Sequence, residues 1–509
     1  MHTVSCLLTA VSLLAPFATR ATDAPTAGEA RAERAFRGTR GDPGTTLAFL
    51  RPMPKGGDLH NHLSGSVYAE SFIRWAADAG LCVSPSKIEL SSPPCDGADI
   101  VPVTEAQKTP ALYRRIVDAF SMRNWQLSGQ SGHDHFFGTF SKFSRATEGQ
   151  TGKMLAETAS RAAAQGEIYQ ELMLTPASEL VTDLAKRTAW DDDFGRLRQA
   201  MLDGMKQVVE MARTEIEKAE AIRDEELGCR SSRADPGCEV VQRYVAQVSR
   251  GSAREKVFAQ MLAGFEVASS VPQFVALNLV QPEDDPVPMR DFSLQMRMLQ
   301  YLHNVYPKVH ITLHAGELAP GLVPPEGLAF HVRDSILMGQ AERIGHGVDV
   351  MGERDALGLL REMARRRILV EICLTSNEGI LGVRGAAHPL GNYLRAGVPV
   401  ALATDDEGVS RSDMTHEYLK AAQEQGLGYR QLKRMARNSL TYAFLPGESL
   451  WRADGSPARA CASELTRAGA RARSRGCQQL LDGSEKARLQ RRLEEQFAQF
   501  ESSLQRAPR

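Results

Sequence analysis

The sequence has no excess of charge of either sign. It contains 61 Lys and Arg against 62 Asp and Glu, which gives a net charge of −1 over 509 residues. Nucleic-acid-binding domains usually carry a basic stripe, so this balance argues against a nucleic-acid partner. It argues more weakly against a substrate with several phosphates, because a local cluster of Arg and Lys could still bind one.

Two common motifs are also absent. No two cysteines have CxxC spacing, which argues against a cysteine-ligated zinc site. No GxGxxG follows any apolar run, so the main signature of a dinucleotide-binding sheet is missing. No internal repeat is evident either.

The apolar run near the N-terminus, residues 4–17, is too short to span a bilayer comfortably. Small residues follow it at Ala18, Ala21 and Ala24, and this pattern predicts a signal peptide over residues 1–24. No Lys or Arg precedes the run, and a buried N-terminal helix is the alternative. A signal peptide implies an exported protein, periplasmic or secreted, with no membrane anchor.

The cysteines support export independently. Of the eight cysteines, one lies in the predicted signal peptide and six form pairs of short separation: Cys82 with Cys95, Cys229 with Cys238, and Cys461 with Cys477. We expect three local disulfides, which suit an oxidising compartment. Cys373 stands alone in the apolar run "ILVEICL" and is expected to be a buried thiol.

Short apolar runs alternate with longer amphipathic stretches along most of the chain. We expect strands at 57–63, 167–174, 240–248, 274–280, 309–314, 343–348, 367–373 and 398–403. Eight strands that alternate with helices predict an α/β protein, specifically a (β/α)8 TIM-type barrel. An open doubly wound sheet is the alternative. The barrel is expected over residues 51–447, after an arm or partly ordered lead-in at 25–50 and before a helical extension at 448–509.

Enzymes with this barrel carry their chemistry at the C-terminal ends of the strands. Four of the expected strand ends hold histidine or acidic residues: His60 and His62, then His314 and Glu317, then His346, then Asp405 and Asp406. His60 and His62 point the same way, because strand side chains alternate. Any one of these ends has an ordinary structural explanation. Together they indicate a metal site, since imidazole and carboxylate groups are ligands that zinc accepts.

Five motifs in a fixed order carry a family resemblance. The segments "MPKGGDLHNHLSGS", "LHAGE", "ERIGHGVD", "CLTSNE" and "ATDDEGVS" resemble the adenosine deaminase family of metal-dependent purine aminohydrolases. The resemblance covers roughly residues 50–445. The lead-in "PMPKGGDLH" looks most similar to the exported, growth-factor-related and bacterial branches.

The resemblance implies a role for each of these residues. One Zn²⁺ per chain would be bound by four ligands: His60, His62, His314 and Asp405. Glu317 would pass a proton to the purine ring nitrogen next to the attacked carbon. His346 would orient the attacking water and help deprotonate it, and Asp406 would hydrogen-bond the water or the ring. These roles agree with general chemistry, because zinc lowers the pKa of water from ~15.7 to about 7 and a protonated carboxyl group can neutralise charge that develops on the ring.

The implied reaction is hydrolytic deamination of adenosine or 2′-deoxyadenosine, with a small-molecule purine nucleoside as the partner. The arm and the resemblance also suggest a homodimer. Three departures from the family pattern affect the substrate: Ser64 replaces an acidic residue, Asn278 replaces another, and Gln281 replaces a glycine. Another 6-aminopurine compound is therefore an alternative substrate, namely adenine, an N6-substituted adenosine or a nucleotide. A secreted binding or signalling relative with little catalysis is the alternative of a different class.

The segment "GHDHFFGTFSKF" (132–143) holds a second HxH and four phenylalanines at helical spacing. On a helix, His133 and His135 would face different ways, so we do not expect them to share a metal ion. The phenylalanines are expected to be core residues; the alternative is that Phe137 and Phe140 cover the substrate. His310 is expected to be a packed core histidine, and no second ligand lies near His388 in the sequence.

Overall fold

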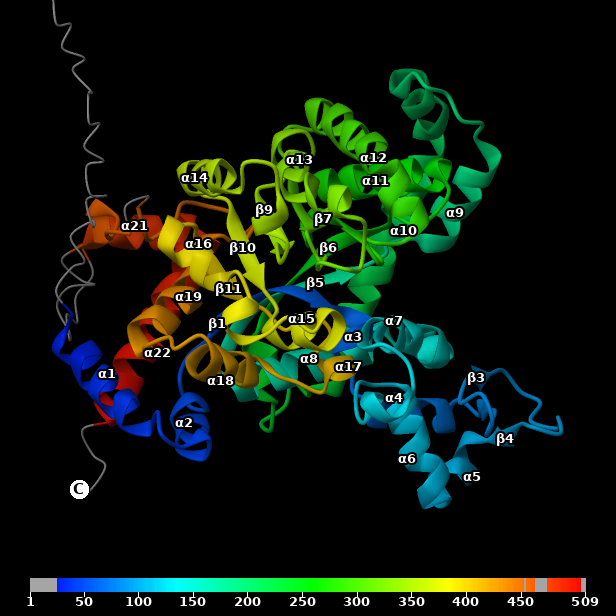
Figure 1. The fold of residues 1–509 in the computed structure, drawn as a ribbon, viewed down its shortest axis with the longest axis horizontal. Coiled ribbons are helices and arrows are strands. Elements are labelled where there is room, and N and C mark those ends of the chain that lie inside the picture. Colours follow the sequence, from blue (N-terminus) through cyan, green and yellow to red (C-terminus); the bar gives the residue numbers. More distant parts are fainter. Residues whose placement is uncertain (1–24, 453–454, 463–473, 505–509) are drawn as a thin grey trace, which may run out of the picture.

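The computed structural model describes residues 25–452, 455–462 and 474–504. Eight parallel strands lie side by side in chain order and form a barrel (Figure 1). They are β1 (Gly56–His62), β5 (Glu167–Leu174), β6 (Val241–Ser249), β7 (Phe274–Val280), β8 (His310–Ala315), β9 (Arg343–His346), β10 (Leu369–Ile372) and β11 (Val400–Leu402). All eight overlap the expected runs, which confirms the (β/α)8 prediction.

The first and last strands close the barrel at a seam made by only a few residues. The backbone N–H of His62 donates to the carbonyl of Asp405 at 2.9 Å, and the N–H of Asp405 donates to the carbonyl of His60 at 2.9 Å. Asn61 and Asp405 form the corresponding parallel bridge. The seam therefore lies at the C-terminal end of the barrel, where the candidate site residues are.

Helices cover the outside of the barrel. The larger ones are α8 (Thr151–Gln165), α10 (Phe194–Glu226), α11 (Arg254–Ser270), α12 (Pro286–Val305), α14 (Ala356–Arg366), α18 (Met414–Glu424) and α19 (Tyr429–Thr441). In α10, the Asp193 side chain caps the first turn by accepting from the N–H groups of Gly195 and Arg196. One face of α10 is then buried at intervals of three and four residues, through Leu197, Met201, Met205, Val208, Ala212, Ile216 and Ala219. The amphipathic pattern thus places the helix on the barrel.

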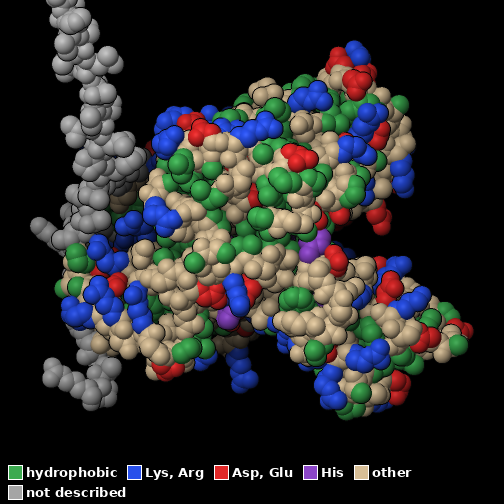
Figure 2. Space-filling view, viewed as in Figure 1, with side chains coloured by type: hydrophobic (Ala, Val, Ile, Leu, Met, Phe, Trp, Pro, Cys, Tyr) green, Lys and Arg blue, Asp and Glu red, His purple; other side chains and the backbone are tan. Residues whose placement is uncertain are grey.

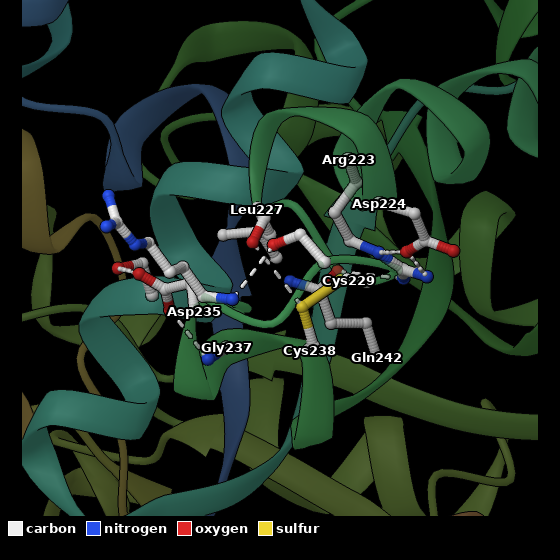
Figure 3. Close-up of a disulfide and its surroundings, with 11 residues drawn as sticks. Arg223, Asp224, Leu227, Cys229, Asp235, Gly237, Cys238 and Gln242 are labelled. Carbon is white, nitrogen blue, oxygen red and sulfur yellow. Dashed lines mark hydrogen bonds and ion pairs between the residues drawn. A yellow bond between two sulfur atoms is a disulfide. The ribbon is translucent and has the colours of Figure 1, made fainter.

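The three predicted disulfides are confirmed, and Cys373 is a buried free thiol. Figure 3 shows the Cys229–Cys238 disulfide, which cross-links the segment between α10 and β6. The same turn is held by the Asp235 N–H, which donates to the Leu227 carbonyl at 2.9 Å, and by the Gly237 N–H, which donates to the Asp235 carboxylate at 2.7 Å. This disulfide therefore fixes the connection between α10 and β6.

A large insertion between β1 and β5 forms a separate lobe. It contains a small antiparallel sheet, made of β2 (Cys82–Val83), β3 (Leu90–Ser91) and β4 (Val101–Pro102), and helices α5 (Val103–Lys108) and α6 (Pro110–Ala119). Figure 1 shows this lobe projecting from the barrel. Figure 2 shows a notch between the two, with a histidine and acidic side chains at its inner end. Helix α7 (Gly132–Phe143) follows the lobe and returns the chain to the barrel.

The lead-in at 25–50, predicted as an arm or partly ordered segment, contains two helices. Helix α1 (Ala27–Thr39) starts with a capping box between Thr26 and Glu29, and α2 (Pro43–Leu50) starts at a proline preceded by the Asp42 cap. Helix α1 packs against α19 and against α22 (Glu485–Ser503) of the C-terminal extension. Lys433 of α19 joins the two ends, 3.0 Å from Glu29 and 2.6 Å from Glu501.

The predicted signal peptide, residues 1–24, lies outside the described residues. The helical prediction for the C-terminal extension holds for α21 (Arg475–Gly483) and α22. Across the part of the chain that the structure describes, no helix combines the length and the apolar character needed to cross a membrane.

A buried ion network lies inside the barrel below the candidate site. Arg343 is 1% exposed; it forms an ion pair with Glu171, its Nε lies 2.7 Å from Glu371 Oε1, and its guanidinium stacks 3.9 Å over the Phe444 ring. Glu371 in turn accepts a hydrogen bond from His60 Nδ1 at 2.7 Å. The network therefore connects the start of β9 to a candidate metal ligand.

We expect Arg343→Met to destabilise the fold strongly, because it leaves two buried carboxylates without their cation. Breaking a buried ion pair on one side costs about 3–5 kcal/mol. Denaturant unfolding would measure the change in the free energy of unfolding. Arg196→Met is the matched control, since Arg196 pairs with Asp191 on the surface and its loss should leave stability nearly unchanged. Equal stability of Arg343→Met and the wild type would contradict the structural role of the network.

Candidate metal and catalytic site

Four predicted ligand residues from three strand ends meet at one point. His60 Nε2 lies 3.0 Å from His314 Nε2, and His62 Nε2 lies 3.2 Å from the same atom. Asp405 Oδ1 lies 3.4 Å from His60 Nε2 and 3.3 Å from His62 Nε2. The four side chains are buried or nearly so. The structure thus brings together all four predicted ligands.

The other ring nitrogen of each histidine faces an oxygen acceptor. His60 Nδ1 donates to Glu371, His62 Nδ1 lies 2.8 Å from Gln247 Oε1, and His314 Nδ1 lies 3.0 Å from Asn278 Oδ1. Asn278 Oδ1 also accepts the backbone N–H of His314, which identifies it as the oxygen. Each neutral ring therefore carries its proton on Nδ1 and directs the Nε2 lone pair at the common point.

This arrangement fits a metal ion better than it fits hydrogen bonding. Two nitrogen lone pairs that face each other at about 3 Å repel unless a cation lies between them. Ligands about 2.1 Å from a tetrahedral zinc ion stand about 3.4 Å apart, close to the separations seen here. Three imidazoles and one carboxylate form a zinc-type donor set.

Glu317 lies beside this cluster, on the turn that follows β8. Gly316 makes the turn with a φ of 72°, and Glu317 is 8% exposed. Burial raises the pKa of Glu317 well above its ordinary value, and the nearby carboxylates of Asp405 and Glu283 raise it further. Among the described residues, Glu317 Oε1 has no hydrogen-bond partner. A protonated carboxyl group with a free oxygen is a proton donor.

His346 and Asp406 complete the predicted catalytic set. His346 is fully buried, with Nε2 3.7 Å from Glu317 Oε1 and 4.0 Å from Asp405 Oδ2. Gly345 must be a glycine, because a Cβ there would lie 2.5 Å from the His60 ring. Burial raises the pKa of Asp406 to about 8, with a further contribution from Asp405. A carboxylate with a raised pKa is a stronger proton acceptor.

Arg250 and Glu283 support the site and were not singled out by sequence reasoning. Arg250, just after β6, is 1% exposed and donates from Nη2 to the carbonyl of His314 at 2.7 Å. Its Nη1 lies 3.5 Å from Glu283 Oε1, and Glu283 Oε2 accepts the backbone N–H of Glu317 at 2.9 Å. The sequence signal that could have identified them is their position just after the ends of β6 and β7, where barrel enzymes carry their site residues.

The predicted substrate contacts Ser64 and Gln281 lie in different environments. Ser64 is half-buried in α3 (Leu63–Ser66), next to Gly65, whose α-carbon packs against the carboxyl group of Asp406. Gln281 has a φ of 88°, and its Oε1 accepts the Gly251 N–H at 2.8 Å, so this exposed side chain is tied to the loop after β6. That φ lies where glycine is usual, as in the family pattern.

Helix α7 divides its phenylalanines between two environments. Phe136 and Phe143 are buried in the core, whereas Phe137 and Phe140 are only half-buried. The start of the helix is pressed against α15 (Leu374–Leu381), since a side chain at Gly132 would collide with the Gly379 carbonyl. The core prediction thus holds for two of the four rings.

The remaining histidines are not ligands of the cluster. His133 Nε2 lies 3.0 Å from Asp284 in the loop after β7, and His135 Nε2 lies 3.0 Å from the carbonyl of Ser121, so the second HxH does not share an ion. His310 is not a packed core residue: its side chain is 44% exposed, 2.7 Å from Glu342 and stacked on Phe444. It is the first residue of β8, at the end where the strand enters the barrel.

Comparisons with known proteins agree with this geometry. The adenosine deaminase family model matches residues 134–452. The adenosine deaminase of Escherichia coli strain SE11 is 41% identical over 140 residues, which is 27% of this chain and 39% of that protein. The match therefore spans about two fifths of the length of this curated relative.

Solved structures share the fold at low sequence identity. Adenine deaminase from Arthrobacter aurescens has a TM-score of 0.50 and 17% identity, covering 77% of this chain and 94% of its own. The N6-methyl-AMP deaminase of Arabidopsis thaliana has a TM-score of 0.50 and 19% identity, covering 79% and 94%. A zinc-bound amidohydrolase from Burkholderia ambifaria has a TM-score of 0.50 and 16% identity, covering 79% and 88%. With a family match over more than half of its length, the chain belongs to the adenosine deaminase family.

Proposed function

We propose that the protein is a zinc-dependent aminohydrolase that converts adenosine or 2′-deoxyadenosine to the corresponding inosine and ammonia. The observation that carries the proposal is the buried Glu317, whose pKa is raised by burial, directly beside a cluster of three imidazoles and one carboxylate. Such a pairing places a proton donor next to a site for activating water. Hydrolysis of an aromatic C–NH2 group needs both.

His60, His62, His314 and Asp405 would hold one zinc ion per chain. When bound, zinc supplies a nucleophilic hydroxide at neutral pH, because it lowers the pKa of water. The choice of zinc rests on the donor set, and the zinc-bound relative in the same fold supports it. Glu371, Gln247 and Asn278 would keep the three rings in the orientation that ligation needs.

The remaining residues handle protons. The oxygen atom of the attacking water adds to the ring carbon that bears the amino group. Electrons move onto the adjacent ring nitrogen, and Glu317 gives its proton to that nitrogen. His346 orients the attacking oxygen, and the carboxylate of Asp406 accepts the proton released by the water. That proton goes to the amino group, the carbon–nitrogen bond breaks, and ammonia leaves. The added oxygen then loses its remaining proton to Glu317, which restores the carboxyl group and gives the carbonyl product with its proton kept on the ring nitrogen.

The proposed substrate depends on residues around the cluster. Ser64 precedes Gly65, which packs against Asp406, and its hydroxyl can hydrogen-bond a sugar hydroxyl. The backbone of Gln281 has a positive φ, a conformation that glycine adopts readily. Phe137 and Phe140 are proposed to cover an apolar part of the substrate. Adenine and N6-substituted nucleotides remain the alternative substrates, since proteins of the same fold are named for them.

A deamination screen tests this proposal. We expect zinc-loaded protein to release ammonia from adenosine and deoxyadenosine with a kcat/KM at least about tenfold higher than from adenine, AMP or N6-methyladenosine, as contacts to the sugar contribute to transition-state binding. Ammonia release, measured by a coupled assay with and without a chelator, gives the ranking. A preference for adenine or a nucleotide would correct the substrate. No turnover of any aminopurine would exclude the enzymatic function.

We also propose that the protein is exported. Three disulfides on the described part of the chain are stable in an oxidising compartment and rare in a reducing one. The predicted signal peptide at 1–24 supplies the route. N-terminal sequencing of protein recovered from the periplasm or the medium would test this. An intact N-terminus at Met1, or absence of the protein from both fractions, would count against it.

A further inference from the structure

A chain of three hydrogen bonds runs from the backbone of Leu390 to His346. The Leu390 N–H donates to His388 Nδ1 at 3.2 Å, His388 Nε2 lies 3.1 Å from Asn377 Oδ1, and Asn377 Nδ2 lies 3.0 Å from His346 Nδ1. His346, Asn377 and His388 are all at most 3% exposed. They come from the end of β9, from α15 and from the loop before α16 (Leu390–Ala396).

The direction of every bond in this chain follows from its first member. A backbone N–H can only donate, so His388 Nδ1 is an acceptor and the ring carries its proton on Nε2. That proton must go to the oxygen of Asn377, which leaves the Asn377 amide NH2 facing His346. If the amide were reversed, both nitrogens of His388 would have to accept, which a neutral imidazole cannot do.

These bond directions determine which ring nitrogen of His346 carries the proton. Its Nδ1 faces a donor and accepts, so Nδ1 carries no proton and the ring is neutral with its proton on Nε2. His346 Nε2 is buried, and no hydrogen-bond partner for it lies among the described residues. The Nε2–H therefore points into the space between Glu317 and Asp405, where the reacting atoms are placed by the proposed function.

We propose that Asn377 and His388 are positioning residues that hold His346 as the neutral Nε2–H tautomer, so that His346 donates a hydrogen bond to the attacking oxygen and does not accept a proton at that nitrogen. The proposal rests on the proposed function for the identity of the reacting oxygen. It replaces the general-base role expected for His346 with that of a hydrogen-bond donor. A carboxylate of the site then takes the proton from water.

The tautomer can be read directly in the zinc-loaded full-length protein. With 15N-labelled histidine, long-range 1H–15N spectra distinguish protonated from unprotonated ring nitrogens, and a His346→Gln spectrum assigns the His346 signals. We expect Nδ1 to be unprotonated and Nε2 to be protonated in the wild type. A protonated Nδ1 in the wild type would overturn the proposal, whatever the activity of the variants.

Asn377→Asp provides the functional half of the test. The substitution places a carboxylate acceptor against His346 Nδ1, which should move the proton to Nδ1. We expect kcat to fall by about 100-fold with KM changed less than about threefold, since the donor toward the reacting oxygen is lost. His388→Gln keeps a side-chain N–H for Asn377 Oδ1 and should retain kcat within a few-fold, whereas His388→Leu should not.

Asn392→Asp is the matched control, because Asn392 lies in α16 near His388 and accepts from Arg395 at the surface. It makes the same chemical change without touching the relay, and we expect wild-type kcat and wild-type histidine spectra. Wild-type kcat in Asn377→Asp would overturn the proposal. If the wild type deaminates no aminopurine, the proposed function fails, while the spectra still decide the tautomer.

Discussion

Glu317→Gln is expected to abolish turnover while the metal stays bound. Glutamine has the size of glutamate and can still hydrogen-bond, but it cannot give a proton to the purine ring nitrogen. Loss of a general acid costs roughly 10²–10⁴-fold in kcat, and a site that must protonate a poorly basic ring nitrogen should lie at the upper end. Steady-state ammonia release together with zinc content by atomic absorption would measure both effects.

The structure provides a matched control for this variant. Glu353 is also buried, and burial raises its pKa to about 7, but it accepts from the N–H groups of Val332 and Arg333 at the start of α13 (His331–Leu337). Glu353→Gln should keep kcat within a few-fold. If Glu317→Gln retained wild-type kcat, Glu317 would not be the proton donor.

Removing the metal is expected to abolish activity and to lower thermal stability together. Chelator-treated protein should lose turnover and recover it on addition of about one equivalent of Zn²⁺. A ligand present at 1,000 times its dissociation constant adds about 4 kcal/mol to the folded state, so the apo form should melt several degrees lower. Calorimetry of both forms, with a metal titration, gives the stoichiometry. Undiminished activity after complete zinc removal would rule out the metal-dependent mechanism.

Asp405→Asn removes the carboxylate ligand from the same site. Asparagine tolerates the φ of 61° at this position, so the backbone at the seam should survive while the anionic ligand is lost. We expect zinc binding to weaken at least about tenfold and kcat/KM to fall by about 10³-fold or more. Asp413→Asn is the control, because Asp413 only caps α18 and asparagine caps equally well.

Strand patterns placed histidine and acidic residues at several strand ends, and the family resemblance selected four of them as the ligand set. His60 and His62 alternate in β1, His314 lies near the end of the apolar run that proved to be β8, and Asp405 follows the run that proved to be β11. The barrel was predictable for the same reason, since buried parallel strands are short, nearly continuous apolar runs. Periodicity identifies such residues without any knowledge of contacts.

The residues behind the ligands could not be predicted in this way. Asn377 and His388 are joined by a contact between a helix and a loop, and neither has a charge or a spacing that marks it. Arg250 was not singled out, because sequence does not show that its guanidinium donates to the carbonyls of Leu279 and His314. The helices of the lead-in were not predicted either, because sequence does not show that α1 packs against α19 and α22.

The seam of the barrel also determines when the site can exist. His60, His62 and Asp405 provide the backbone groups that join β1 to β11, so the ligands and the last closing bonds of the barrel are the same residues. A chain that has not yet brought its first and last strands together holds an incomplete ligand set. The full four-ligand centre therefore requires β1 and the segment after β11 to be paired, and a chain with this seam open cannot hold all four ligands together.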